Sequence, residues 1–212
     1  MTKELNLIAS SQKVENKKIK TKPIDSIVFR MDDFLPNGNA RETSSNGLAV
    51  VGENGNAKAE STNGIAIAGN NGTAQGGQWG ASFAGEEGHA IAGANAVAYA
   101  GKGGVAEGGD GAVAIVLMNL HGKERAKVRD NGIGFCRRGG IAEVGKNSLA
   151  IGFDKTKASA DNGSLIVLRY TDSNGIQRFH IGVVGDGDIK VTKGLQARTF
   201  YKLDANHEFT KV

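Results

Sequence analysis

The chain has 212 residues with a formal net charge of +4, and it holds 32 glycines, 2 prolines and one cysteine, Cys136. This length suits one large domain or one domain with appendages. The scarcity of proline and the lack of a Gly-X-Y repeat exclude collagen, and a single cysteine excludes an intramolecular disulfide framework. No apolar run reaches the roughly 18 residues of a membrane helix, so we expect no membrane contact.

Residues 1–23 are rich in lysine and are expected to form a basic, flexible arm. Such an arm either stays solvated or docks onto a larger assembly, and the absence of interleaved aromatics argues against a nucleic-acid partner. The segment has no apolar region typical of a secretory signal, so we expect synthesis in the cytoplasm. Incorporation into a virion is a separate hypothesis. Residues 24–44, which include IDSIVFRMDDFLP at 24–36, are expected to form an N-terminal cap.

Residues 45–167 repeat in blocks of about eight, such as SNGLAVVG at 45–52, TNGIAIAG at 62–69 and ANAVAYAG at 94–101. Each block is a turn signal followed by a short run with period two, which predicts a strand rather than a helix. Asn-Gly and Gly-Gly pairs supply the positive φ angles of tight corners. After an irregular segment that follows Val116, the pattern resumes at Gly132.

In each run, one alternating set of positions is small and the other set varies. The variable set is apolar in every second block and polar in the blocks between, so the true repeat is a coil of about sixteen residues with two strands; His89 and Ile91 break this rule. The small set consists of Ala49, Ala57, Ala66, Ala74, Ser82, Ala90, Ala98, Ala106, Ala114, Gly134, Ala142, Ala150 and Ala158.

The small residues must face inward, because the opposite arrangement would bury Lys58, Gln75 and Glu107 at a cost of several kcal/mol each. We therefore predict an all-β fold, a parallel β-solenoid (β-roll) with coils of about sixteen residues, a thin alanine core and a small β cap at the C-terminus. One outer face is expected to be polar and the other apolar.

The apolar outer face is predicted to be an oligomer interface. About eight coils at roughly 4.8 Å make a stripe roughly 40 Å long, which exceeds the apolar area that a monomer normally exposes. A second copy of the chain is the simplest partner for such a stripe. The predicted interface residues are Leu48, Val50, Ile65, Ile67, Phe83, Val97, Tyr99, Val113, Ile115, Ile133, Phe135, Leu149 and Ile151.

Residues 168–212 are expected to cap the C-terminal end of the solenoid, because an open sheet edge invites further pairing. Ser173–Gly175 reads as the turn of a hairpin between two apolar strands. Residues 198–203 read as a further strand.

The repeats KNSLAIGFDKTKASADNGSLIV (146–167) and GANAVAYAGKGGVAEGGDGAVAIV (93–116) resemble the head repeats of trimeric autotransporter adhesins of the YadA type. Those heads are left-handed parallel β-rolls that trimerise through apolar outer faces, so the resemblance implies a homotrimer. The C-terminal segment is similar to an uncharacterised domain that ends many bacterial and phage glycine-rich repeat proteins.

The motifs favour neither a cofactor nor a metal, and we expect no enzyme and no catalytic residues. The four histidines lack metal-ligand spacing, Asp186 and Asp188 resemble a polar turn, and Cys136 falls at a core position. Trp79 lies at a corner and is the candidate for ligand stacking. The basic residues Arg125, Lys127, Arg129, Arg137 and Arg138 form either a phosphate-binding patch or a solvated edge.

Three functions follow from this pattern. The first is a structural protein, a trimeric fibre or a head- or tail-associated component of a bacteriophage-like particle. The second is a soluble oligomeric binding module, an immunity or counter-defence protein that grips a protein or nucleotide. The third is a surface adhesin.

Overall fold

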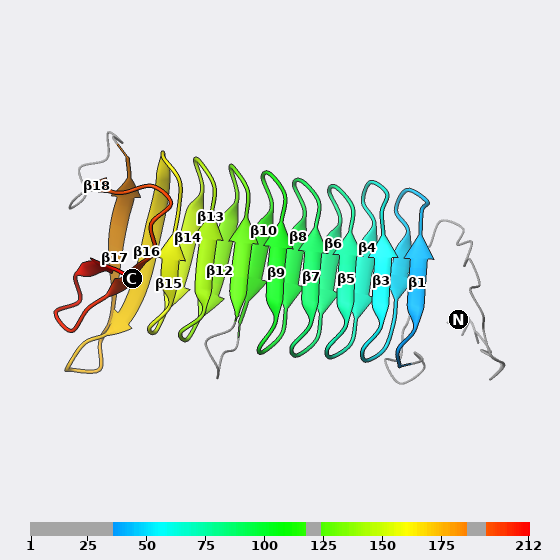
Figure 1. The fold of residues 1–212 in the computed structure, drawn as a ribbon, viewed down its shortest axis with the longest axis horizontal. Coiled ribbons are helices and arrows are strands. Elements are labelled where there is room, and N and C mark those ends of the chain that lie inside the picture. The colour runs from blue at the N-terminus through cyan, green and yellow to red at the C-terminus, as the bar shows by residue number, and fades with distance from the viewer. Residues whose placement is uncertain (1–35, 118–123, 186–193) are drawn as a thin grey trace, which may run out of the picture.

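In a computed structural model, residues 36–117, 124–185 and 194–212 are described, and they form a β-solenoid of about eight coils (Figure 1). Up to residue 171, successive strands belong alternately to two sheets, and the strands in each sheet are parallel along the solenoid. The predicted all-β fold with coils of about sixteen residues is therefore confirmed. Within these residues, no helix is long and apolar enough to cross a membrane.

We name the two sheets after their outer faces. The polar sheet consists of β1 (Asn39–Glu42), β3 (Asn56–Ala59), β5 (Thr73–Gly76), β7 (His89–Ala92), β9 (Val105–Gly108), β11 (Arg125–Val128), β13 (Ile141–Val144), β15 (Lys157–Ser159), β19 (Tyr201–Leu203) and β20 (Phe209–Lys211). The apolar sheet consists of β2 (Leu48–Val50), β4 (Ile65–Ala68), β6 (Ala81–Ala84), β8 (Val97–Ala100), β10 (Val113–Val116), β12 (Ile133–Arg137), β14 (Leu149–Phe153), β16 (Ser164–Thr171), β17 (Gln177–Val184) and β18 (Gly194–Leu195).

The core between the sheets is a layer of small side chains. Ala66, Ala98 and Ala150 are each 0% exposed, which confirms that the small set faces inward. Each small residue stacks on its equivalent in the next coil, as Ala98 does on Ala114. Larger buried residues such as Ile166 occur near the C-terminal end, where the solenoid meets its cap.

The expected Asn-Gly and Gly-Gly pairs supply the positive φ of the corners, and the first residue of the pair adopts it, as Gly103 does with a φ of 77°. At the Asn-Gly corners the asparagine is the residue with positive φ, for example Asn46 at 60° and Asn95 at 53°. The next residue is glycine because the coils stack closely there. A Cβ added to Gly80 would lie 2.0 Å from the carbonyl oxygen of Gly64 in the preceding coil.

The parallel ladder is longer and more regular than predicted. Strand β1 pairs in parallel with β3, so the ladder extends into the range expected to form the N-terminal cap. Strand β11 lies in the segment interpreted as irregular, yet it pairs in register with β9 and β13. That interpretation was wrong for Arg125–Val128, and the additional residues of this coil lie between β10 and β11. His89 and Ile91 stand on the outer face of the polar sheet.

The C-terminal segment folds against the last coils. Strands β16 and β17 form the predicted antiparallel hairpin around Ser173–Gly175. The hairpin β19–β20 joins the polar sheet through the pairing of Ala158 with Tyr201. The strand expected at 198–203 covers only Tyr201–Leu203, because Arg198 has a φ of 53° at a corner.

Several predictions fall on residues that are outside the described part of the chain. These are the basic arm at 1–23, the first part of the expected N-terminal cap, and the turn with Asp186 and Asp188.

Candidate functional site

The first candidate site is the outer face of the apolar sheet. All thirteen predicted interface residues lie on this face, in rows that run from coil to coil. In one row, for example, Ile67 neighbours Phe83, and Phe83 neighbours Tyr99. The structure therefore places the predicted residues together, and their contact with another chain stays a prediction.

This apolar face continues into the cap. Phe153 extends the row of outward residues on β14, and Val167 on β16 pairs with Ile181 on β17. Phe179 and Ile181 are 55% and 41% exposed, which is more than most of the repeat residues. Phe153 and Phe179 were not among the residues predicted for this face, although Phe153 follows Ile151 at the same period-two spacing.

The side chains on the apolar face cover one another only in part. Ile65 and Phe83 remain 38% and 40% exposed although they have neighbours in the adjoining coils. The rings of Phe83 and Tyr99 lie 6.4 Å apart between centroids, and those of Phe135 and Phe153 lie 5.0 Å apart at nearly a right angle. Each row thus leaves a continuous strip of apolar surface.

The opposite face, on the polar sheet, compensates its own charges. Glu60 accepts ion pairs from both Arg41 and Lys58, and Glu143 lies within 4.0 Å of both Arg125 and Lys127. Hydrogen bonds from Lys58 and then Arg41 hold the pKa of the Glu60 carboxyl below its usual range. Such a surface is stable in water without a partner, in contrast to the apolar face.

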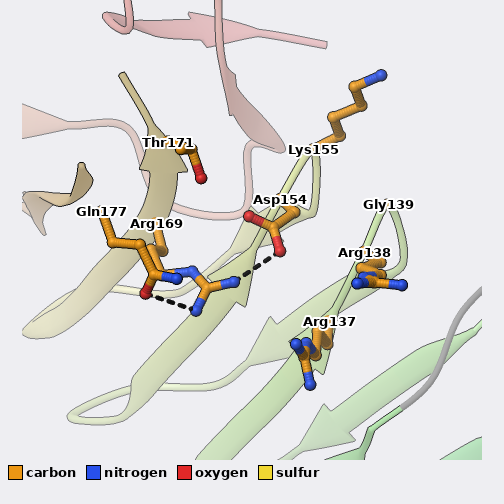
Figure 2. A pocket seen from close by; sticks show the side chains of 8 residues that line it. All are labelled: Arg137, Arg138, Gly139, Asp154, Lys155, Arg169, Thr171 and Gln177. Atoms are coloured by element: carbon orange, nitrogen blue, oxygen red, sulfur yellow. Dashed lines mark hydrogen bonds and ion pairs between the residues drawn. The ribbon is translucent and has the colours of Figure 1, made fainter. Parts of the chain in front are cut away.

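The second candidate site is a basic pocket where the apolar sheet approaches the cap (Figure 2). Its volume is about 530 Å³. The residues that line it are Arg137, Arg138, Gly139, Asp154, Lys155, Arg169, Thr171 and Gln177.

The structure divides the basic residues that sequence analysis grouped together. Arg125 and Lys127 lie on the outer face of the polar sheet and are paired with Glu143. Arg137 lies on the apolar sheet, on the other side of the solenoid, with Arg138 at the following corner. The five residues therefore do not form one patch, and only Arg137 and Arg138 belong to the pocket.

Two other residues singled out from the sequence lie apart from both sites. Cys136 is fully buried, and this burial raises the pKa of its thiol to about 12. Trp79 is 63% exposed at a corner with a φ of 57°, where most other coils have asparagine or glycine. Among the described residues, no group of three or more His, Cys, Asp or Glu side chains has a geometry that could hold a metal ion.

Comparison of the chain with protein-family models, curated proteins and solved structures finds no significant match. The resemblance to trimeric autotransporter heads therefore remains a prediction from the repeats.

Proposed function

We propose that this protein is a non-enzymatic structural element that self-associates, as a homotrimer, through the outer face of its apolar sheet. The observation that carries the proposal is the row of large apolar side chains that runs without a break from Val50 on β2 to Ile181 on β17. A contiguous apolar surface of this kind marks a protein interaction site.

A second copy of the chain fits this face better than an unrelated partner. Along each row, successive side chains repeat with the spacing between parallel strands, roughly 4.8 Å. Another copy has the same spacing along its rows, so its side chains can enter the gaps between successive side chains along the whole length of the solenoid. Identical surfaces also allow the closed symmetry that most soluble oligomers have.

The expected free energy of association is small enough for the oligomer to form reversibly. Because the thirteen side chains are already partly covered, each gains only about 1 kcal/mol when its remaining surface is buried. The total is on the order of 10 kcal/mol per protomer, against an association cost of roughly 4–15 kcal/mol. The two quantities are of the same order, so the oligomer is expected to dissociate on dilution and to be sensitive to single charges.

The larger assembly is proposed to be a fibre or a head- or tail-associated component of a bacteriophage-like particle. A straight stack of coils of nearly equal length supports a mechanical role (Figure 1). The choice of three copies relies on the resemblance of the repeats to adhesin heads.

Introducing two lysines on the apolar face tests the proposal. In Ile67→Lys with Ile115→Lys, each lysine is placed in the middle of a row and would be buried unpaired against its symmetry mates, at several kcal/mol per charge. The control variant, Thr73→Lys with Gln75→Lys, adds the same charge to the polar sheet.

Light scattering coupled to size exclusion should give a trimer for the wild type and the control, and a monomer for Ile67→Lys/Ile115→Lys. Far-UV circular dichroism should be the same for all three proteins. A wild-type mass retained by Ile67→Lys/Ile115→Lys would show that the apolar face is not the interface.

A further inference from the structure

The basic pocket begins in one row of the apolar sheet in which arginine and phenylalanine alternate. Arg137 on β12 is the register neighbour of Phe153 on β14, which neighbours Arg169 on β16, and Arg169 neighbours Phe179 on β17. The neighbouring row, through Phe135 and Ile151, is apolar. Among the described residues of the apolar face, positive charge therefore occurs at this edge.

The Arg169 guanidinium is held in a fixed orientation. Its Nη2 donates to Asp154 Oδ2 at 2.6 Å and its Nη1 donates to Gln177 Oε1 at 3.1 Å. Its Cζ lies 4.1 Å from the centroid of the Phe153 ring, a cation–π contact. The side chain is only 12% exposed, so little conformational entropy remains for a ligand to remove.

The other cations of the pocket are uncompensated. Within the described residues, Arg137, Arg138 and Lys155 form no ion pair, and the Nε of Arg137 is buried without a hydrogen-bond partner. Four cationic side chains and one carboxylate line the pocket, and that carboxylate is engaged by Arg169. In Figure 2, Arg137 and Arg138 lie on one side of Arg169, while Lys155 extends outward from its corner.

The corner residues add a second indication. Arg138 and Lys155 have φ values of 55° and 68°, a conformation that costs free energy for residues other than glycine and asparagine. The earlier described corners on the same side of the solenoid carry Asn37, Asn54, Asn71, Glu87 and Gly103. Among the described corners on this side, basic residues therefore occur beside the pocket.

We propose that this pocket binds a phosphate group. A guanidinium offers two parallel donors that match phosphate oxygens, and arginines are the residues of choice for such recognition. The charge excess suits a phosphate monoester, which carries between about −1.5 and −2 at neutral pH. A volume of about 530 Å³ also leaves room for a group attached to the phosphate. Phe179, the exposed register neighbour of Arg169 on β17, lies outside the lining residues and offers such a group an aromatic ring for stacking.

Titration with inorganic phosphate and with adenosine monophosphate, followed by ³¹P NMR and calorimetry, tests this site. We expect saturable binding of one phosphate per chain that weakens as the NaCl concentration rises. Arg138→Gln and Arg137→Gln should each weaken binding about tenfold or more, as expected for the loss of one charged hydrogen-bond donor. Lys127→Gln, which removes a cation from the polar sheet, is the matched control and should change affinity less than twofold.

The two probes distinguish the source of the phosphate. Equal affinities indicate a site for the phosphate group alone. Tighter binding of the nucleotide that is lost in Phe179→Ala indicates a nucleotide site, and either result supports the proposal. Melting temperatures of the variants show whether each remains folded, and Arg138 at an exposed corner is the variant least expected to disturb the fold.

No saturable binding of either probe at millimolar concentration would overturn the proposal. So would binding that Arg138→Gln and Lys127→Gln reduce equally, because it would then follow net charge alone. The titration is repeated on the Ile67→Lys/Ile115→Lys variant, so that a failure of self-association and a failure of the phosphate site are seen separately.

Discussion

Replacing Ala98 with leucine measures how closely the two sheets pack. Ala98 is 0% exposed on β8, with Ser82 and Ala114 as its neighbours in the adjoining coils. Leucine adds three carbon atoms that these neighbours cannot accommodate unless the two sheets separate. Overpacking of this kind costs about 1–3 kcal/mol in ordinary cores. We expect at least about 3 kcal/mol here, because every coil repeats the same narrow spacing.

The matched control is Val97→Leu, on the outer face of the same strand, where the side chain is 37% exposed. A conservative change at such a surface position should alter the free energy of unfolding by no more than about 0.5 kcal/mol. Urea denaturation followed by far-UV circular dichroism compares both variants at one protein concentration, because association also stabilises the fold. A smaller loss for Ala98→Leu than for Val97→Leu would refute the assignment of the core.

Three further predictions concern ionisable groups. The Cys136 thiol should not react with a thiol reagent at pH 8 until denaturant is added. Its pKa is raised from 9.0 to about 12 in the folded protein, so above about pH 9 the thiol ionises in the unfolded chain first and the fold should lose stability. A hydrogen bond from the backbone N–H of Asn162, and then one from Arg198, lowers the pKa of Asp161. Its stabilising contribution is therefore present at neutral pH and is lost as the pH falls through the lowered pKa, and thermal melts of Asp161→Asn should lack that acid transition. Glu124 is 0% exposed, and among the described residues neither of its carboxylate oxygens has a hydrogen-bond partner. Glu124→Met removes this buried carboxylate and should therefore raise the free energy of unfolding in urea by about 1–3 kcal/mol. An unchanged or lower free energy of unfolding would contradict the assignment of Glu124 as an unsatisfied buried group.

The repeating part of the fold was predictable because each coil has the same alternation of small inward residues and larger outward residues. Alternation of Ala98 with Val97 and Tyr99 distinguishes the inner from the outer face, and the same alternation recurs one coil later at Ala114. The extent of the ladder was harder to predict. Four additional residues between β10 and β11 interrupt the sixteen-residue spacing of the coils. The Arg125–Val128 strand has charged residues at both of its variable positions, so its part in the repeat was hard to recognise from the sequence.

The basic pocket could be predicted only by placing residues of successive coils side by side. Arg137, Phe153 and Arg169 are spaced by the coil length of sixteen, so the repeat itself carried the signal for this row. Gln177 could not be placed in the same way. It reaches Arg169 across an antiparallel hairpin, and the register of that hairpin depends on the conformation of its turn.

Sedimentation equilibrium of the wild-type protein over a range of concentrations tests the proposed self-association most directly. We expect a mass three times the 22.0 kDa of one chain at high concentration, falling towards the monomer on dilution. A mass of 22.0 kDa at every concentration would contradict the assignment of the apolar face as an interface between copies of this chain.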